Sequence, residues 1–216
     1  AGIDSTGPSF DSDGDHDAYR NKAFNLSLSH TFGERFEAGL NLLDSRGRSE
    51  YDNPFGGFDP VTFESFGQQP YTDFSVSSLG SYFDAQLTDA WHSRLELAHS
   101  ENRDDKRDKL SAERFVFNTY RDQVTWQNDL ALGERNNLLL GGDWYEDRVH
   151  ASTDFTEDSR WNRAVFVQHR YQGERFSTEV GVRHDRNQQF GGQTTWSGSL
   201  TVPLNAQNDV LLSYSE

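Results

Sequence analysis

The sequence contains no cysteine and no methionine, only 5 prolines, and only 33% apolar residues. The absence of cysteine excludes a disulfide framework, a zinc ribbon and a cysteine nucleophile. No stretch approaches the roughly 18 consecutive apolar residues that a transmembrane helix requires. Low apolar content with a net charge of -15 is typical of disordered chains. Aromatic residues nevertheless make up 13% of the chain, and this combination predicts a sheet with one apolar and one polar face.

Acidic residues outnumber basic ones by 35 to 20, and the sequence pI is about 4.8. A general nucleic-acid-binding protein needs a basic surface, so nucleic acid is excluded as a partner. The chain begins at Ala1 in a loop-like stretch and ends at Glu216 within an expected strand. We therefore interpret residues 1–216 as a processed protein or an excised piece, with one structural unit.

Alternation of apolar and polar residues with a period of two recurs about ten times, which predicts β-strands. In residues 24–32, for example, Phe24, Leu26 and Leu28 alternate with asparagine and serine. No segment has a convincing helical period. The expected strands run about 10–14 residues, longer than the usual 5–6 of soluble proteins.

The connections between these strands alternate in length. The tripeptide Gly-Glu-Arg occupies three of the short ones, at residues 33–35, 133–135 and 173–175, where glycine supplies a positive φ. The expected long connections are polar and cover residues 45–73, 100–116, 147–161 and 185–193. Short turns at one end and long loops at the other are typical of an outer-membrane up-and-down β-barrel.

A soluble β-sandwich would produce the same alternation, so strand length and aromatic placement decide between the two. A tilted membrane strand needs about 9–11 residues, which these segments provide. Aromatic residues at the expected strand ends predict an interfacial girdle: Phe32, Phe36, Trp91, Tyr171, Phe176 and Tyr214. We predict an all-β fold, a transmembrane antiparallel barrel with its apolar face in lipid.

Charged and amide residues occupy the other face of the expected strands, where they would line the lumen. These residues are Arg94, Glu96, Gln123, Gln127, Asp129, Asp143, Glu179 and Arg183. Solvation of the lumen explains most of them without a specific ligand.

An acidic N-terminal segment is the main candidate site. Asp11, Asp13, Asp15 and Asp17 stand at alternate positions, and calcium takes six to eight such oxygen ligands. The segment lacks the twelfth-position glutamate of an EF-hand, and a solvated acidic loop is the alternative.

Tyr51, Asp52 and Asp73 lie at the ends of the next long connection and could complete this site.

Other chemistry has less support. Seven histidines are scattered, and none forms a paired metal-binding spacing. Asp104, Asp105 and His150 could serve as acid and base groups, but no nucleophile elbow accompanies them. We predict that the chain is not an enzyme.

The ordered series of motifs resembles the vitamin B12 (cobalamin) transporters of the TonB-dependent receptor family. The resemblance rests on residues 15–32 and 48–52 and continues more loosely through 124–128, 141–144, 192–196 and 210–215. It implies about ten consecutive strands of a 22-stranded barrel in the outer membrane of a Gram-negative bacterium. The N-terminal plug and the C-terminal strands would lie outside these residues.

The resemblance also implies TonB-dependent uptake of cobalamin, with calcium as a cofactor. It assigns Asp15 and Asp17, then Tyr51 and Asp52, to calcium-binding loops; Asp11, Asp13 and Asp73 are assigned by position. The implied partners are cobalamin, outer-membrane lipid, a TonB-type energy-coupling protein acting through the plug, and phages or bacterial toxins. The alternatives are a receptor for a ferric siderophore and a self-contained ten-stranded barrel acting as an enzyme or adhesin.

Overall fold

The computed structural model describes residues 2–4, 17–52, 57–66 and 68–216. It contains one large antiparallel sheet in the order β1-β2-β3-β6-β7-β8-β9-β10-β11-β12-β13, and a small sheet of β4 and β5. The strands are β1 (Gly2–Asp4), β2 (Ala18–Phe32), β3 (Phe36–Glu50), β4 (Gly57–Phe58), β5 (Ser65–Phe66), β6 (Pro70–Thr88), β7 (Trp91–Asp108), β8 (Arg114–Ala131), β9 (Asn136–Ala151), β10 (Ser159–Gln172), β11 (Ser177–Asn187), β12 (Gly191–Asn205) and β13 (Asn208–Ser215).

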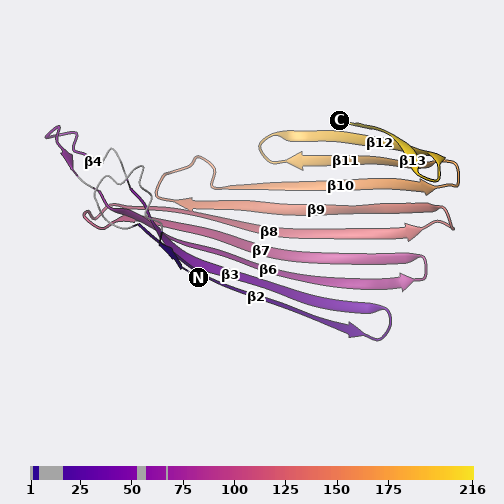
Figure 1. Ribbon diagram of the computed structural model, residues 1–216, viewed down its shortest axis with the longest axis horizontal. Coiled ribbons are helices and arrows are strands. Elements are labelled where there is room, and N and C mark those ends of the chain that lie inside the picture. Colours follow the sequence, from indigo (N-terminus) through magenta and orange to yellow (C-terminus); the bar gives the residue numbers. More distant parts are fainter. Residues whose placement is uncertain (1, 5–16, 53–56, 67) are drawn as a thin grey trace.

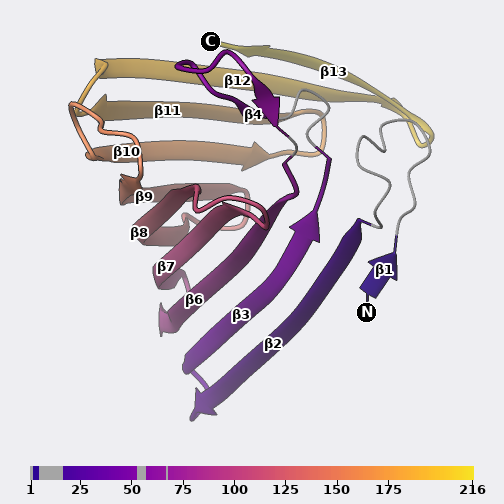
Figure 2. The ribbon, with the colours of Figure 1, turned by 90° about the vertical axis from the view of Figure 1, so that its left-hand side faces the viewer.

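The large sheet is an up-and-down meander, as the alternation predicts. Each long strand pairs with the next long strand, with short turns at one end and the longer connections at the other (Figure 1). The sheet curves through an arc and stays open, because β1 and β13 form its two edges (Figure 2). The described part of the chain is therefore a partial barrel wall. It does not form the closed ten-stranded barrel that was one of the alternatives.

Apolar side chains are exposed on one face of the sheet instead of being buried in a core. Ala85 and Ala164 are the only buried apolar residues among the described ones, whereas Phe24 and Leu28 are each 56% exposed. A soluble sandwich would cover this face with a second layer. Among the described residues no helix is long and apolar enough to span a membrane.

The cross-strand register gathers these side chains into one continuous band, which we call the apolar belt. In register, Leu28 lies opposite Leu40, Leu95 opposite Trp126, and the pattern continues around the sheet. The belt comprises the same-face residues of segments 24–32, 36–42, 79–85, 91–97, 124–130, 138–144, 165–171, 178–182, 196–202 and 210–214. Its height of about 7–9 residues per strand approaches the thickness of a bilayer's hydrocarbon core.

The polar face carries the residues predicted for the lumen. Arg94 donates to Asp84 at 2.7 Å, and Arg183 donates to Asp143 at 2.8 and 3.1 Å, so cations and anions satisfy one another across neighbouring strands. The predicted lumen set alternates with the belt on every strand involved.

The strands are longer than predicted, and three of the predicted loops are mostly strand. The observed connections are 51–69, 109–113, 152–158 and 188–190, because β6, β7 and β8 run for 18 or 19 residues. Beyond the belt both faces contact water, so backbone pairing continues there without any apolar alternation to reveal it. Cross-strand ion pairs replace the apolar contacts in this region.

Two details of the turns and girdle differ from prediction. Gly33 and Gly133 have the expected positive φ of 68° and 83°, but Gly173 is not among the residues with positive φ. Tyr171 and Phe176 flank that turn with ring centroids 5.3 Å apart. Tyr214 lies six positions from the start of β13 and contacts Trp196, so it does not border a short turn.

Candidate functional site: a polar hollow at the loop end of the wall

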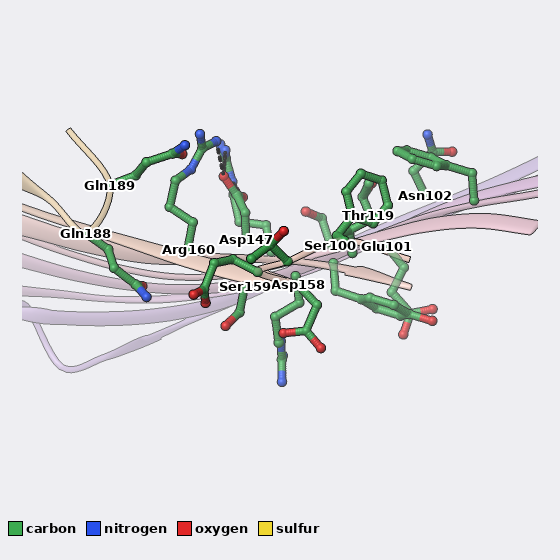
Figure 3. A pocket seen from close by; sticks show the side chains of 18 of the residues that line it. Ser100, Glu101, Asn102, Thr119, Asp147, Asp158, Ser159, Arg160, Gln188 and Gln189 are labelled. Atoms are coloured by element: carbon green, nitrogen blue, oxygen red, sulfur yellow. Dashed lines mark hydrogen bonds and ion pairs between the residues drawn. The ribbon is translucent and has the colours of Figure 1, made fainter. Parts of the chain in front are cut away.

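A hollow of about 1030 Å³ lies on the polar face, toward the end of the sheet that carries the longer connections. Side chains from the five adjacent strands β6 to β10 and from two connections line it (Figure 3). Its lining includes Phe117, Arg121, Asp147, Phe155, Arg160, Gln188 and Gln189. Such a volume matches the upper range of small-molecule sites.

The floor of the hollow is a bidentate ion pair between β8 and β9. Arg121 donates to both carboxylate oxygens of Asp147, at 2.6 and 2.9 Å, and stacks over the Tyr145 ring at 4.5 Å. Hydrogen bonds from Arg121, followed by the weaker effect of Arg160, lower the pKa of Asp147 below its usual value. The carboxylate therefore stays ionised, and the pair keeps a fixed orientation toward the hollow.

Arg160 contributes its terminal guanidinium nitrogens to the site. One of its terminal nitrogens lies 3.6 Å from Asp147, while its buried Nε has no hydrogen-bond partner among the described residues. Gln188 and Gln189 approach from the connection that follows β11 (Figure 3). A polar ligand with several acceptors would find donors at each of these positions.

Residues 152–158 fold over the polar face and close one side of the hollow. Ser152 holds this connection at one end by exchanging hydrogen bonds of 2.9 Å with Val116. At the centre, the Phe155 ring meets the edge of Phe117 with centroids 6.4 Å apart. This aromatic contact joins a loop to the wall and positions the loop beside any bound ligand.

We expect Phe155→Ala to loosen this loop without disturbing the sheet. Loss of the edge-to-face contact costs about 0.5–1.5 kcal/mol beyond the lost area. Amide hydrogen exchange should therefore accelerate within residues 152–158 and stay unchanged in the paired parts of β8 and β9. An equal acceleration in both strands would contradict the assignment of Phe155 to the loop contact alone.

The predicted calcium ligands fall partly outside the described residues: this applies to Asp11, Asp13 and Asp15. Asp17 precedes β2 directly and Tyr51 follows β3 directly, so both residues lie at the same end of this hairpin, beyond its last pair of Tyr19 with Ser49.

Tyr51 donates its backbone N–H to Pro70 at 3.2 Å, and Lys106 lies 5.5 Å from its ring. Asp52 follows Tyr51 at the same end of the hairpin.

Asp73 lies on the other face of the sheet from Tyr51. Arg48 donates to its two oxygens at 2.7 and 2.9 Å and stacks on Tyr71 at 4.3 Å. Among the described residues no three acidic or histidine side chains gather as a metal site. A calcium role for Asp73 stays a prediction, and it would require exchange of the arginine for the ion.

Asp105 is another carboxylate of this region that forms ion pairs with arginine. It lies opposite Asp73 in register, and Arg107 and Arg114 bind it at 2.6 to 2.8 Å. Their hydrogen bonds, with that from Arg107 the strongest, hold its pKa well below the usual range. Asp104 points to the opposite face as the next residue of the strand, so the two do not form an acid–base pair.

The sequence pattern predicts loops at Asp147, Phe155, Arg160 and Gln188, leaves Phe117 and Arg121 between an expected loop and an expected strand, and gives none of these residues a role. Arg121 and Asp147 are 26 positions apart in the sequence. They lie on adjacent strands, and only the register between β8 and β9 brings them together. Phe155 closes one side of the hollow through its contact with Phe117, a residue of another element of the fold. The sequence offers one signal for these residues: charged side chains of both signs recur with the same period of two as the apolar side chains of the neighbouring segments.

Sequence comparison finds relatives among transporters. The chain is 25% identical to the vitamin B12 transporter BtuB of Photobacterium profundum, over 92% of this chain and 31% of that protein. It is 24% identical to BtuB of Vibrio cholerae serotype O1 (strain M66-2), over 94% of this chain and 32% of that protein. The chain spans about a third of the length of these curated relatives. It matches no protein-family profile.

Solved structures with the same fold are also outer-membrane receptors or transporters. The FrpB iron transporter of Neisseria meningitidis (F3-3 variant) aligns with a TM-score of 0.76 and 12% identity, covering 92% of this chain and 36% of that one. A mutant ferric enterobactin receptor, PfeA of Pseudomonas aeruginosa, aligns with a TM-score of 0.75 and 14% identity, covering 98% and 35%. None of these relatives is an enzyme, in agreement with the prediction. The chain therefore has the barrel fold of the TonB-dependent receptors of the Gram-negative outer membrane and resembles their vitamin B12 transporters in sequence.

Proposed function

We propose that the protein containing this chain takes up vitamin B12 (cobalamin) across the outer membrane in a TonB-dependent manner. The observation that carries the proposal is the sequence relation to B12 transporters along 92–94% of the chain. The structural neighbours named for iron or siderophores share the fold at only 12–14% identity.

The hollow beside Arg121 gives the ligand a preformed contact surface. Cobalamin is bulky and carries peripheral amides, which both donate and accept hydrogen bonds. Arg160, Gln188 and the Arg121–Asp147 pair offer partners of both kinds. Fixing these groups before binding lowers the ordering cost of capture. Release toward the periplasm would then depend on a plug and a TonB-type partner protein.

Calcium would support the same function by ordering the acidic N-terminal segment. Asp15 and Asp17, together with Tyr51 and Asp52, supply hard oxygen ligands of the type that calcium prefers. Asp11 and Asp13 would add to this set, whereas Asp73 would have to exchange Arg48 for the ion. Binding of the ion before the ligand would reduce the entropy lost when the ligand binds.

Equilibrium binding of cyanocobalamin to the full-length protein in detergent tests this proposal. We expect tight binding that weakens by about tenfold or more when calcium is chelated, equivalent to roughly 1.4 kcal/mol. Asp15→Asn with Asp17→Asn should weaken binding similarly and remove the response to chelator.

Asp59→Asn is the matched control for this experiment. Asp59 is also a loop carboxylate, but it accepts backbone hydrogen bonds from Val61 and Thr62, so its substitution should leave the calcium response intact. Absence of cyanocobalamin binding with and without calcium would refute the cobalamin assignment. Calcium-independent binding of a ferric chelate would then favour a siderophore receptor, the function named for PfeA.

A further inference from the structure

Two arginines face each other without a counter-ion just beyond the apolar belt. Arg163 on β10 and Arg186 on β11 are direct cross-strand partners, and both side chains are exposed on the belt face. No carboxylate among the described residues forms an ion pair with either one. Like charges directly opposite each other destabilise a sheet, and a bound anion would remove this cost.

Elsewhere on this rim, every pair of facing cations among the described residues includes an arginine that binds a carboxylate of the protein. Three other pairs of cross-strand cations occur there: Lys22 with Arg46, Arg20 with Arg48, and Arg107 with Arg114. In each pair an arginine also binds a carboxylate, which is that of Asp44, Asp73 or Asp105 respectively. The pair on β10 and β11 has no such carboxylate.

The surroundings place this pair at the level of lipid headgroups. Below Arg163 on β10 lies Val165, which belongs to the belt and is 63% exposed; below Arg186 on β11 lie His184 and then Val182, a belt residue that is 44% exposed. Trp144 is the partner of Arg163 on β9, and the Trp161 ring lies 5.4 Å from the Arg163 guanidinium. Tryptophan is typical of the membrane–water interface.

The other side of the pair is left open. Gly192 is the partner of Arg186 on β12 and has no side chain to cover it. An anion could therefore approach both guanidinium groups from the lipid side.

We propose that Arg163 and Arg186 bind the phosphate of an outer-leaflet lipid whose acyl chains pack on the belt. Two arginines at facing positions of neighbouring strands can both reach one phosphate, and each guanidinium group can donate paired hydrogen bonds to its oxygens. The bound phosphate would remove the repulsion between the arginines and fix this part of the wall at a defined depth.

Lipid retention by the full-length protein tests the proposal. The protein is incubated in mixed micelles with bisphosphorylated lipid A or with its dephosphorylated form, and bound lipid is counted by native mass spectrometry. Arg163→Gln with Arg186→Gln should lower the affinity for the phosphorylated form about tenfold or more, since each interfacial arginine contributes roughly fivefold. Affinity for the dephosphorylated form should not change.

Two further variants separate charge recognition from structural damage. Arg163→Lys with Arg186→Lys should restore most of the binding because both charges remain. Arg46→Gln with Arg103→Gln removes two arginines that are paired within the same rim, with Asp44 and Glu101, and should change affinity less than about twofold.

Three outcomes would overturn the inference. They are unchanged binding in the glutamine variant, equal loss of the phosphorylated and dephosphorylated lipids, and displacement of the lipid by low-millimolar inorganic phosphate. The last would identify a free anion as the ligand. The test does not involve cobalamin, so its result is independent of the proposed uptake function.

Discussion

Replacing Leu28 with arginine should destabilise the protein in a bilayer by about 2–4 kcal/mol. Leu28 lies at the centre of the belt segment of β2, pairs with Leu40 and is 56% exposed. In water this exposure would make arginine harmless. In lipid the same position would force a charge into hydrocarbon, so the sign and size of the effect report which solvent contacts this face.

Ser27→Arg is the control, because Ser27 is the adjacent residue and points to the polar face, opposite Asn41. There the guanidinium group stays in water, and the cost should remain within about 0.5 kcal/mol. Urea unfolding of the full-length protein from vesicles measures both values. Equal costs at the two positions would refute the assignment of the faces.

Gly141→Ala should cost about 3 kcal/mol, at the upper end of what overpacking usually costs. A Cβ at this position on β9 would overlap the carbonyl oxygen of Trp126 and lie 2.8 Å from the Phe166 ring, which covers the glycine from the next strand. The oxygen belongs to a backbone that is hydrogen-bonded in the sheet, so it cannot move aside as a flexible side chain could.

Gly80→Ala provides the comparison, since Gly80 also lies on the polar face of a long strand. Among the described residues no heavy atom beyond its chain neighbours would come within 4 Å of an added Cβ. We expect a change within about 1 kcal/mol, and of stabilising sign because alanine loses less backbone entropy on folding. Thermal unfolding in detergent suffices to compare the two variants. A Gly141 variant as stable as the Gly80 variant would show that β8 and β9 are not packed this closely.

Sequence reasoning predicted the belt well because lipid on one face imposes a period of two. Residues 24–32 and 36–42 show this clearly, and their strands and turn are where the alternation placed them. Past Leu97 the signal ends, although β7 continues to Asp108. With water on both faces, no residue type is excluded from either face, and only pairing with β6 and β8 defines the strand.

The candidate sites follow the same division. The predicted hairpin places Asp17 and Tyr51 at the same end of the sheet, and their grouping as calcium ligands stays a prediction. The hollow could not be predicted, because Phe155 reaches Phe117 through a loop whose path depends on the folded wall. Asp73 was chosen for its charge, and only the register reveals Arg48 as its partner.

The extension of β7 beyond the belt gives the barrel mouth a stiff collar. From His99 to Asp108 the strand continues for ten residues, roughly 33 Å along its length. A solute would travel between hydrogen-bonded walls well before it reached the level of the membrane. A solute confined between such walls would meet the binding surface repeatedly. In open water, by contrast, a solute diffuses away after an unproductive encounter.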